Sequence, residues 1–278
     1  MPNPRNTIVT SLTRRLWLAA LTAAAICGLL VFRVLGTRTT FGRHFDVSAI
    51  QNGLALTGGS LNSSNALLVA VSSTSFALIG GLLIGVSLLR RRIDLAAATG
   101  VTLFGAFATT ETMKATLAGR PGVPDYLGHG FPSGHSTLAL SLGLSYVLLT
   151  PRRRRAFAVV AALVYAAAMG VALVFNAWHL PSDVGGGFCV ATAWAAAAAQ
   201  LVRRPVERGI PVPLLAAAAV LVALAGVAAV HLRPGLSFTV TSHGRLLEAA
   251  LGIAVTAAIC CVAFAYAIAE RSAAATRS

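Results

Sequence analysis

Long apolar blocks separated by short polar stretches dominate the chain. They cover approximately Leu16–Leu35, Ala66–Leu89, Leu95–Met113, Ser136–Leu149, Ala156–Phe175, Val184–Val202, Val212–Val230 and Leu246–Ala269. Most are close to the roughly 20 residues that cross a hydrocarbon layer of about 30 Å as a helix. Backbone polar groups within lipid need partners in their own segment, so these blocks are expected to be helical. The pattern predicts an all-α, polytopic transmembrane bundle of about eight spans.

The charged residues support this prediction and assign the two sides of the membrane. The composition is 56% hydrophobic and 11% charged, and the net charge of +14 comes from arginines clustered at alternate block ends. This placement favours membrane topology over a nucleic-acid partner, because it forms no basic face. The clusters are Arg5, Arg14 and Arg15, then 90–92, 152–155, 203–208, and Arg271 with Arg277. By the positive-inside rule this side is cytoplasmic, so we expect a plasma-membrane protein with both termini in the cytoplasm.

The remaining junctions lie on the opposite face and hold the residues with the most chemical potential. They are 36–65, 114–135, 176–183 and 231–245. Together they contain all six histidines and the only lysine, Lys114. The histidines are His44, His129, His135, His179, His231 and His243. This segregation predicts a site on the extracytoplasmic face.

Three short motifs in these junctions suggest phosphate chemistry. Lys114 and Arg120 bring two cations to the end of the third block. Next, Pro132-Ser133-Gly134-His135 leads into the fourth block, where a helix N-terminus offers unpaired N–H groups to an anion. Finally, Asp183 follows His179 by four residues, so its carboxylate reaches the imidazole if a helix begins near Pro181.

These motifs resemble those of the type 2 phosphatidic acid phosphatase superfamily, in which a lysine before Arg-Pro precedes Pro-Ser-Gly-His and then a His and Asp pair. The likeness covers roughly residues 66–200. It implies a phosphatase-like core over 16–202, six helices including the first span, and an additional transmembrane hairpin over 212–269. No repeat or long soluble segment interrupts residues 1–278, which we therefore interpret as a single membrane domain.

The resemblance also implies a mechanism. His179 would be the nucleophile that forms a phosphohistidine, with Asp183 orienting it, and His135 would be the general acid and base. Phosphate would bind to Lys114, Arg120, Ser133 and Gly134. No metal or cofactor is required. The partners would be membrane lipids and a lipid phosphate substrate, such as phosphatidic acid, phosphatidylglycerol phosphate, or a polyprenyl phosphate or diphosphate.

Two departures from the family pattern stand out. Five residues separate Lys114 from Arg120 where six are usual, and Ala172-Leu173 occupies the place of Ser-Arg in the third motif. A phosphate-binding arginine is therefore missing there. The candidate replacements on the same face are Asn176, His129, Arg233 and Arg245.

Several alternatives stay open at this point. Lys114 has Glu111 as a possible partner one turn away, and Arg245 has Glu248. The run Gly185-Gly186-Gly187 is more typical of helix packing than of a phosphate loop. A metal site from His44, Asp46, His231 and His243 fits no usual ligand spacing. The competing functions are a lipid-binding or carrier protein on the same fold, and a lipid phosphotransferase.

Overall fold

The computed structural model describes residues 4–56, 73–117, 119–120, 123, 125–128, 130–202 and 240–269. Every regular element in this part of the chain is helical, which confirms the predicted all-α class. The helices are α1 (Pro4–Arg38), α2 (Thr40–Leu56), α4 (Ser73–Leu89), α5 (Ile93–Thr116), α6 (Asp125–Gly128), α7 (Gly134–Leu149), α8 (Arg155–Phe175), α9 (Pro181–Ala199) and α11 (Val240–Ile268), with a 3-10 turn at Arg152–Arg154.

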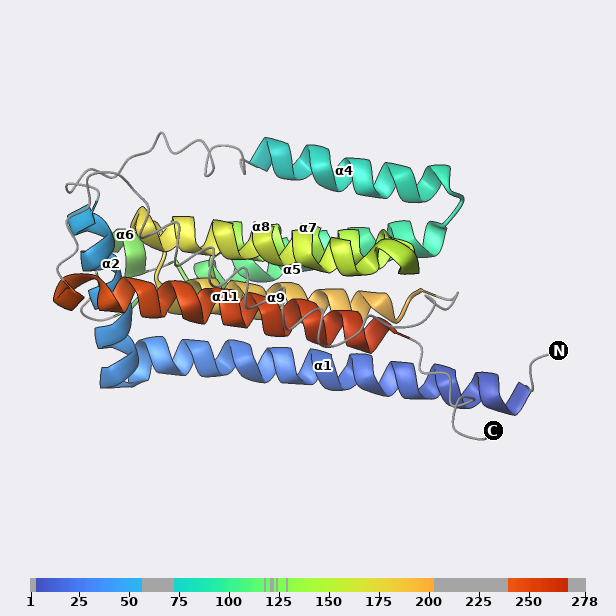
Figure 1. Cartoon of the computed structure of the whole chain (residues 1–278), viewed down its shortest axis with the longest axis horizontal. Coiled ribbons are helices and arrows are strands. Elements are labelled where there is room, and N and C mark those ends of the chain that lie inside the picture. Colours follow the sequence, from blue (N-terminus) through green and yellow to red (C-terminus); the bar gives the residue numbers. More distant parts are fainter. Residues whose placement is uncertain are drawn as a thin grey trace.

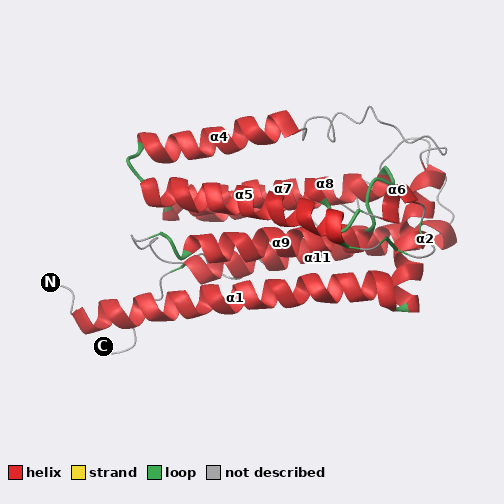
Figure 2. Cartoon of the chain, turned by 180° about the vertical axis from the view of Figure 1, so that it is seen from behind, coloured by secondary structure: helices red, strands yellow, loops and turns green. Residues whose placement is uncertain are grey.

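The long helices run side by side, and α2 lies across one end of the bundle (Figures 1 and 2). At the other end, α1 begins and α11 ends. Helix α9 is the central helix, because it packs against α1, α5, α7 and α11. The bundle thus has two chemically distinct ends, joined by helices that pass through its full length.

Helix length and hydropathy identify a membrane protein. Four helical segments are long and apolar enough to cross a membrane: Leu12–Arg38, Ile93–Thr116, Arg155–Phe175 and Gly244–Ile268. Of the shorter apolar helices, Gly134–Leu149 packs against α5 and α8, and Phe76–Leu89 lies on the outside of the bundle against α5 and α7. Large side chains such as Leu16 and Leu30 of α1 are exposed, as expected for a helix that faces lipid.

The described structure adds one helix to the predicted organisation and includes only part of the predicted C-terminal hairpin. The junction 36–65, for which the sequence predicts no element, contains helix α2. The predicted block 212–230 lies outside the described residues, so only α11 of the hairpin over 212–269 is seen. Because α11 packs against α8 and α9, it belongs to the same bundle as the predicted core.

Successive glycines allow α9 to occupy the centre. A Cβ atom on Gly185, Gly186 or Gly187 would come closer than 3.0 Å to Phe32, Phe131 or Ser136, respectively. The interpretation of this run as a packing feature is therefore confirmed. Close contact here brings the N-terminal turn of α9 against α1, α7 and the segment before α7, from which the site is built.

Arginines at the end where α1 begins bind the C-termini of neighbouring helices. Arg14 donates to the carbonyl oxygen of Ala199, the last residue of α9, at 2.9 Å and to that of Val202, just beyond the helix, at 3.1 Å. Arg90 donates to Leu149 O, at the end of α7, at 3.4 Å. The last carbonyls of a helix lack intrahelical donors and carry partial negative charge, so these arginines stabilise the helix ends.

Candidate active site

The motif segments meet at the end of the bundle where α2 lies. The Ser133 N–H, which precedes α7, donates to the Asp183 carbonyl oxygen in α9 at 2.9 Å. This bond links the start of α7 to the first turn of α9, 50 residues apart in the sequence. It also brings the rings of His135 and His179 to 6.3 Å between centroids. The two histidines predicted to cooperate therefore lie on one face of one site.

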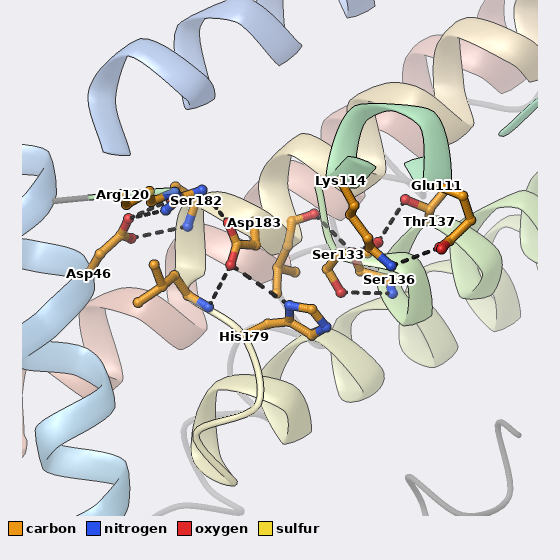
Figure 3. A network of polar contacts seen from close by, with 12 residues as sticks. Asp46, Glu111, Lys114, Arg120, Ser133, Ser136, Thr137, His179, Ser182 and Asp183 are labelled. Atoms are coloured by element: carbon orange, nitrogen blue, oxygen red, sulfur yellow. Dashed lines mark hydrogen bonds and ion pairs between the residues drawn. The ribbon is translucent and has the colours of Figure 1, made fainter. Parts of the chain in front are cut away.

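His179 is held in the short connection between α8 and α9. Its backbone N–H and that of Trp178 both donate to Leu173 O, at 3.4 Å and 2.9 Å, as the chain leaves α8. Helix α9 begins at Pro181, as predicted, and this places His179 Nδ1 3.7 Å from Asp183 Oδ2. Figure 3 shows the other ring nitrogen, Nε2, pointing away from Asp183.

Asp183 is fully buried and is held from two sides. Its Oδ2 accepts a hydrogen bond from the Leu180 N–H at 3.1 Å, which satisfies one of the free donors at the start of α9. Its Oδ1 forms an ion pair and hydrogen bond with Arg120. The carboxylate is thus fixed with Oδ2 directed toward the imidazole of His179, the arrangement that stabilises a developing positive charge on that ring.

Arg120 points into the bundle and binds protein carboxylates. One guanidinium nitrogen contacts Asp183, and the other donates to Ser182 Oγ at 2.9 Å and to Asp46 Oδ2 at 3.4 Å. The side chain is 0% exposed. Figure 3 places it on the opposite side of Asp183 from Lys114. The sequence predicts that Arg120 binds phosphate, but in the structure its guanidinium is bound to Asp183, Asp46 and Ser182.

Asp46 of α2 is a component of the site that the sequence did not reveal. It is 2% exposed and accepts hydrogen bonds from the Ser182 backbone, at 3.1 Å, and from the Ser182 hydroxyl. Burial raises the pKa of its carboxyl to about 6, and the charge of Asp183 adds to this rise, while Ser182 and Arg120 oppose it. The sequence suggested only a metal-ligand role for Asp46, but its contacts are with Ser182 and Arg120.

Lys114 lies above the first turn of α7. Its Nζ is 2.8 Å from Glu111 Oε1, the partner anticipated from the sequence, and the side chain stays 28% exposed. The same Nζ is 3.0 Å from the position that a Cβ on Gly134 would occupy. Ser133 caps α7, because its Oγ accepts the Ser136 N–H at 3.4 Å. Cation and helix N-terminus together make a positive surface.

His135 lies in the first turn of α7, close to this surface. It is half-buried, and its ring meets the edge of Trp178 at a centroid distance of 5.8 Å. An attacking atom stands about 3–3.5 Å from phosphorus. A proton donor stands about 2.6–3.2 Å from the oxygen it serves. With their ring centroids 6.3 Å apart, His135 and His179 can both reach one tetrahedral group.

The place of the missing third-motif arginine is filled by core packing. Leu173 is 0% exposed, and Asn176 uses its side-chain N–H to cap α8 at Ala172 O, 2.7 Å away. Arg245 pairs with Glu248 at 2.8 Å. His129 and Arg233 lie outside the described residues.

Arg33, which belongs to none of the three motifs, is a further cation near the site. Its guanidinium carbon lies 5.5 Å from the centre of the Phe131 ring, and its charge acts on those of Asp183 and Arg120. The signal was available, because Arg33 interrupts an apolar span, and ionisable residues within spans are functional candidates by default.

Comparison with known proteins supports the same region. Residues 101–207 match the PAP2 superfamily, a segment that contains α7, α8 and α9 with both histidines and Asp183. Asp46 and Arg33 lie outside the matched segment. No curated protein and no solved structure matches the chain significantly. The matched segment covers less than half of the chain, and it agrees with the family resemblance drawn from the three motifs.

Proposed function

We propose that this protein is a membrane lipid phosphatase that hydrolyses a lipid phosphomonoester or diphosphate through a phosphohistidine on His179. The match of residues 101–207 to the PAP2 superfamily supports phosphatase-type activity on phosphate esters. The observation that carries the finer proposal is the arrangement of two imidazoles 6.3 Å apart, one of them backed by a buried carboxylate. That arrangement provides a nucleophile and a proton donor for one phosphorus atom.

In the first step, His179 Nε2 attacks phosphorus and the bond from phosphorus to the departing oxygen breaks. His135 gives its proton to that oxygen, so the alcohol or phosphate leaves protonated. Asp183 stabilises the positive charge that develops on the His179 ring. In the second step, His135 takes a proton from water, the water oxygen attacks phosphorus, and inorganic phosphate leaves His179 free.

Charge on the phosphoryl oxygens would be balanced by Lys114 and the first turn of α7. Burial, the charge of His179 and the charge of Lys114 lower the pKa of His135 to about 4, and the negative charge of a bound phosphate would raise this pKa again, so that His135 holds the proton it donates. The Lys114 ammonium lies above Gly134. Fixed donors at the place where negative charge is spread stabilise the transition state. In this proposal Arg120 acts on the reaction through Asp183, and no metal takes part.

The position of the site favours a lipid substrate. It lies at the end of the bundle opposite the arginine-rich end, which corresponds to the extracytoplasmic face under the positive-inside rule. A headgroup would enter from water while its chains stay in the bilayer. Phosphatidic acid, phosphatidylglycerol phosphate and polyprenyl phosphates or diphosphates all meet this requirement.

The test is phosphate release by the purified protein from this panel of lipids, with His179→Ala as the inactive reference. We expect saturable release by the wild type, a loss of at least about 1,000-fold in the variant, and an acid-labile phosphate on His179 in rapidly quenched samples. EDTA should leave the rate unchanged. A wild-type rate equal to that of His179→Ala, or a strict metal requirement, would contradict the proposal.

Leu173 at the place of the family arginine favours one competing function, a lipid-binding protein without turnover. Saturable lipid binding with no phosphate release from any substrate would select it. A phosphotransferase differs only in the second step, where an acceptor hydroxyl replaces water. Mass spectrometry of the products distinguishes it by a phosphorylated acceptor in place of free phosphate.

A further inference from the structure

We propose that Asp46 is a positioning residue for the nucleophile, because it fixes the start of α9 and the Arg120 guanidinium together, and through them the orientation of Asp183. The inference rests on the proposed function of His179. Asp46 comes from α2, which lies outside the PAP2-matched segment, so it adds to the site a residue that the family match does not include.

The first contact fixes the helix that carries Asp183. Asp46 Oδ1 accepts the Ser182 backbone N–H at 3.1 Å, and Oδ2 accepts the Ser182 hydroxyl. Ser182 is the residue immediately before Asp183, in the first turn of α9. A carboxylate bound to the N–H groups of a first turn satisfies free donors and complements the positive helix end. Asp46 therefore sets the position of this turn from outside α9.

The second contact divides Arg120 between two carboxylates. Its Nη1 is 3.4 Å from Asp46 Oδ2, and its Nη2 binds Asp183 Oδ1. Because Arg120 holds only Oδ1, the Oδ2 atom of Asp183 is left for Leu180 and for His179. Without the charge of Asp46, the planar guanidinium would be free to bind both oxygens of Asp183, the geometry that arginine and carboxylate prefer. That rearrangement would draw Oδ2 away from the imidazole.

Close packing and apolar side chains surround Asp46. A Cβ on Gly36 of α1 would approach Ser182 Oγ, Asp46 Oδ2 and Arg120 Nη1 at 2.6, 3.0 and 3.1 Å. On its other side, Asp46 borders an apolar cavity of about 230 Å³, lined by Phe32, Leu35, Phe41, Phe45 and Ile253 among others. Electrostatic interactions are strong in such a region, so the charge of Asp46 acts effectively on Arg120.

The test is Asp46→Asn, which keeps the size of the side chain and an acceptor oxygen for Ser182 but removes the charge that acts on Arg120. We expect kcat to fall by about 10- to 100-fold, as for a small displacement of reacting groups. KM should stay within about twofold, since uniform substrate binding is untouched. The melting temperature at pH 7 should be no lower than that of the wild type. In single-turnover experiments, phosphorylation of His179 should slow by the same factor as kcat.

The matched control is Asp94→Asn, which removes the carboxylate paired with Arg92 at 2.8 Å at the opposite end of the bundle. It should leave kcat unchanged. Ser182→Ala is the second variant, because it removes the hydroxyl bonded to both Asp46 and Arg120 and keeps the backbone bond. We expect a smaller fall in kcat there, with folded protein retained.

An active wild type with unchanged kcat in folded Asp46→Asn would overturn the positioning role and leave the phosphatase proposal intact. The same conclusion follows if Asp46→Asn fails to fold and Ser182→Ala keeps full kcat. A wild type that releases no phosphate from any lipid of the panel would overturn both proposals together.

Discussion

The two ends of the bundle use arginine in opposite ways. At the end where α1 begins, Arg14 and Arg90 donate to carbonyl oxygens at helix C-termini, and Arg90 is exposed. At the histidine end, Arg120 is 0% exposed and binds two buried carboxylates. A carbonyl oxygen at a helix end carries only a partial charge and can bind water in place of the arginine. A buried carboxylate has no water to replace its cation, so the position of Arg120 is more strongly fixed than those of Arg14 and Arg90.

The largest effect is expected from Arg120→Ala. It would leave Asp46 and Asp183 buried without their cation, and breaking a buried pair in this way costs about 3–5 kcal/mol. Denaturant unfolding in detergent should report this loss of stability, and turnover should fall by at least about 100-fold because Asp183 is no longer oriented.

Arg90→Ala is the matched variant at the opposite end. Removal of the Arg90 side chain should lower the free energy of unfolding by no more than about 1 kcal/mol, as expected for a cation at a helix C-terminus. Equal losses of stability in Arg120→Ala and Arg90→Ala would remove the distinction between the two ends.

An intermediate effect is expected from Lys114→Met, which keeps the aliphatic length and removes the charge. Lys114 is 28% exposed and pairs with an exposed glutamate, so stability should change by less than about 1 kcal/mol. If Lys114 holds the phosphoryl oxygens, kcat/KM should fall by about 10- to 1,000-fold. A variant with normal kcat/KM would assign Lys114 to its pair with Glu111 alone.

The smallest effect concerns pH. Burial raises the pKa of Asp46 from 3.8 to about 6, with Arg120 and Asp183 as its charged neighbours. Between these values the folded protein holds a proton that the unfolded chain releases, so this contribution to stability is full below pH 4 and is lost as the pH rises to 6. Asp46→Asn lacks this dependence.

The melting temperature of Asp46→Asn should therefore rise relative to the wild type by about 2–5 °C between pH 4 and pH 7. Melting curves of both proteins across this range provide the measurement. A constant difference between the two curves would show that the carboxyl titrates normally in the folded protein.

Local patterns in the sequence were sufficient for the spans and for the histidine and aspartate pair. Apolar length predicted α1, α5 and α8, and the spacing of four residues predicted the approach of His179 to Asp183. The spans depend on helix geometry, which repeats along the chain, and the approach of His179 depends on α9 beginning at Pro181, two residues after it.

Longer-range features could not be predicted in this way. Helix α2 mixes polar and apolar residues, so no span pattern marks it, and Asp46 meets Ser182 across 136 residues. The partner of Arg120 was also beyond local patterns. A guanidinium near a phosphate motif has the same sequence signature whether it faces a ligand or a carboxylate of the protein, and only the packing of α1, α2 and α9 decides between them.

The three glycines at the start of α9 have a consequence for mutagenesis. They face Phe32 of α1, Phe131 before α7, and Ser136 of α7, each at a separation too small for a methyl group. Single alanine substitutions at Gly185, Gly186 and Gly187 would therefore each introduce a steric clash at a different interface of α9. Comparing their effects on turnover would rank how strongly each neighbour of the central helix is mechanically coupled to the chemistry at its tip.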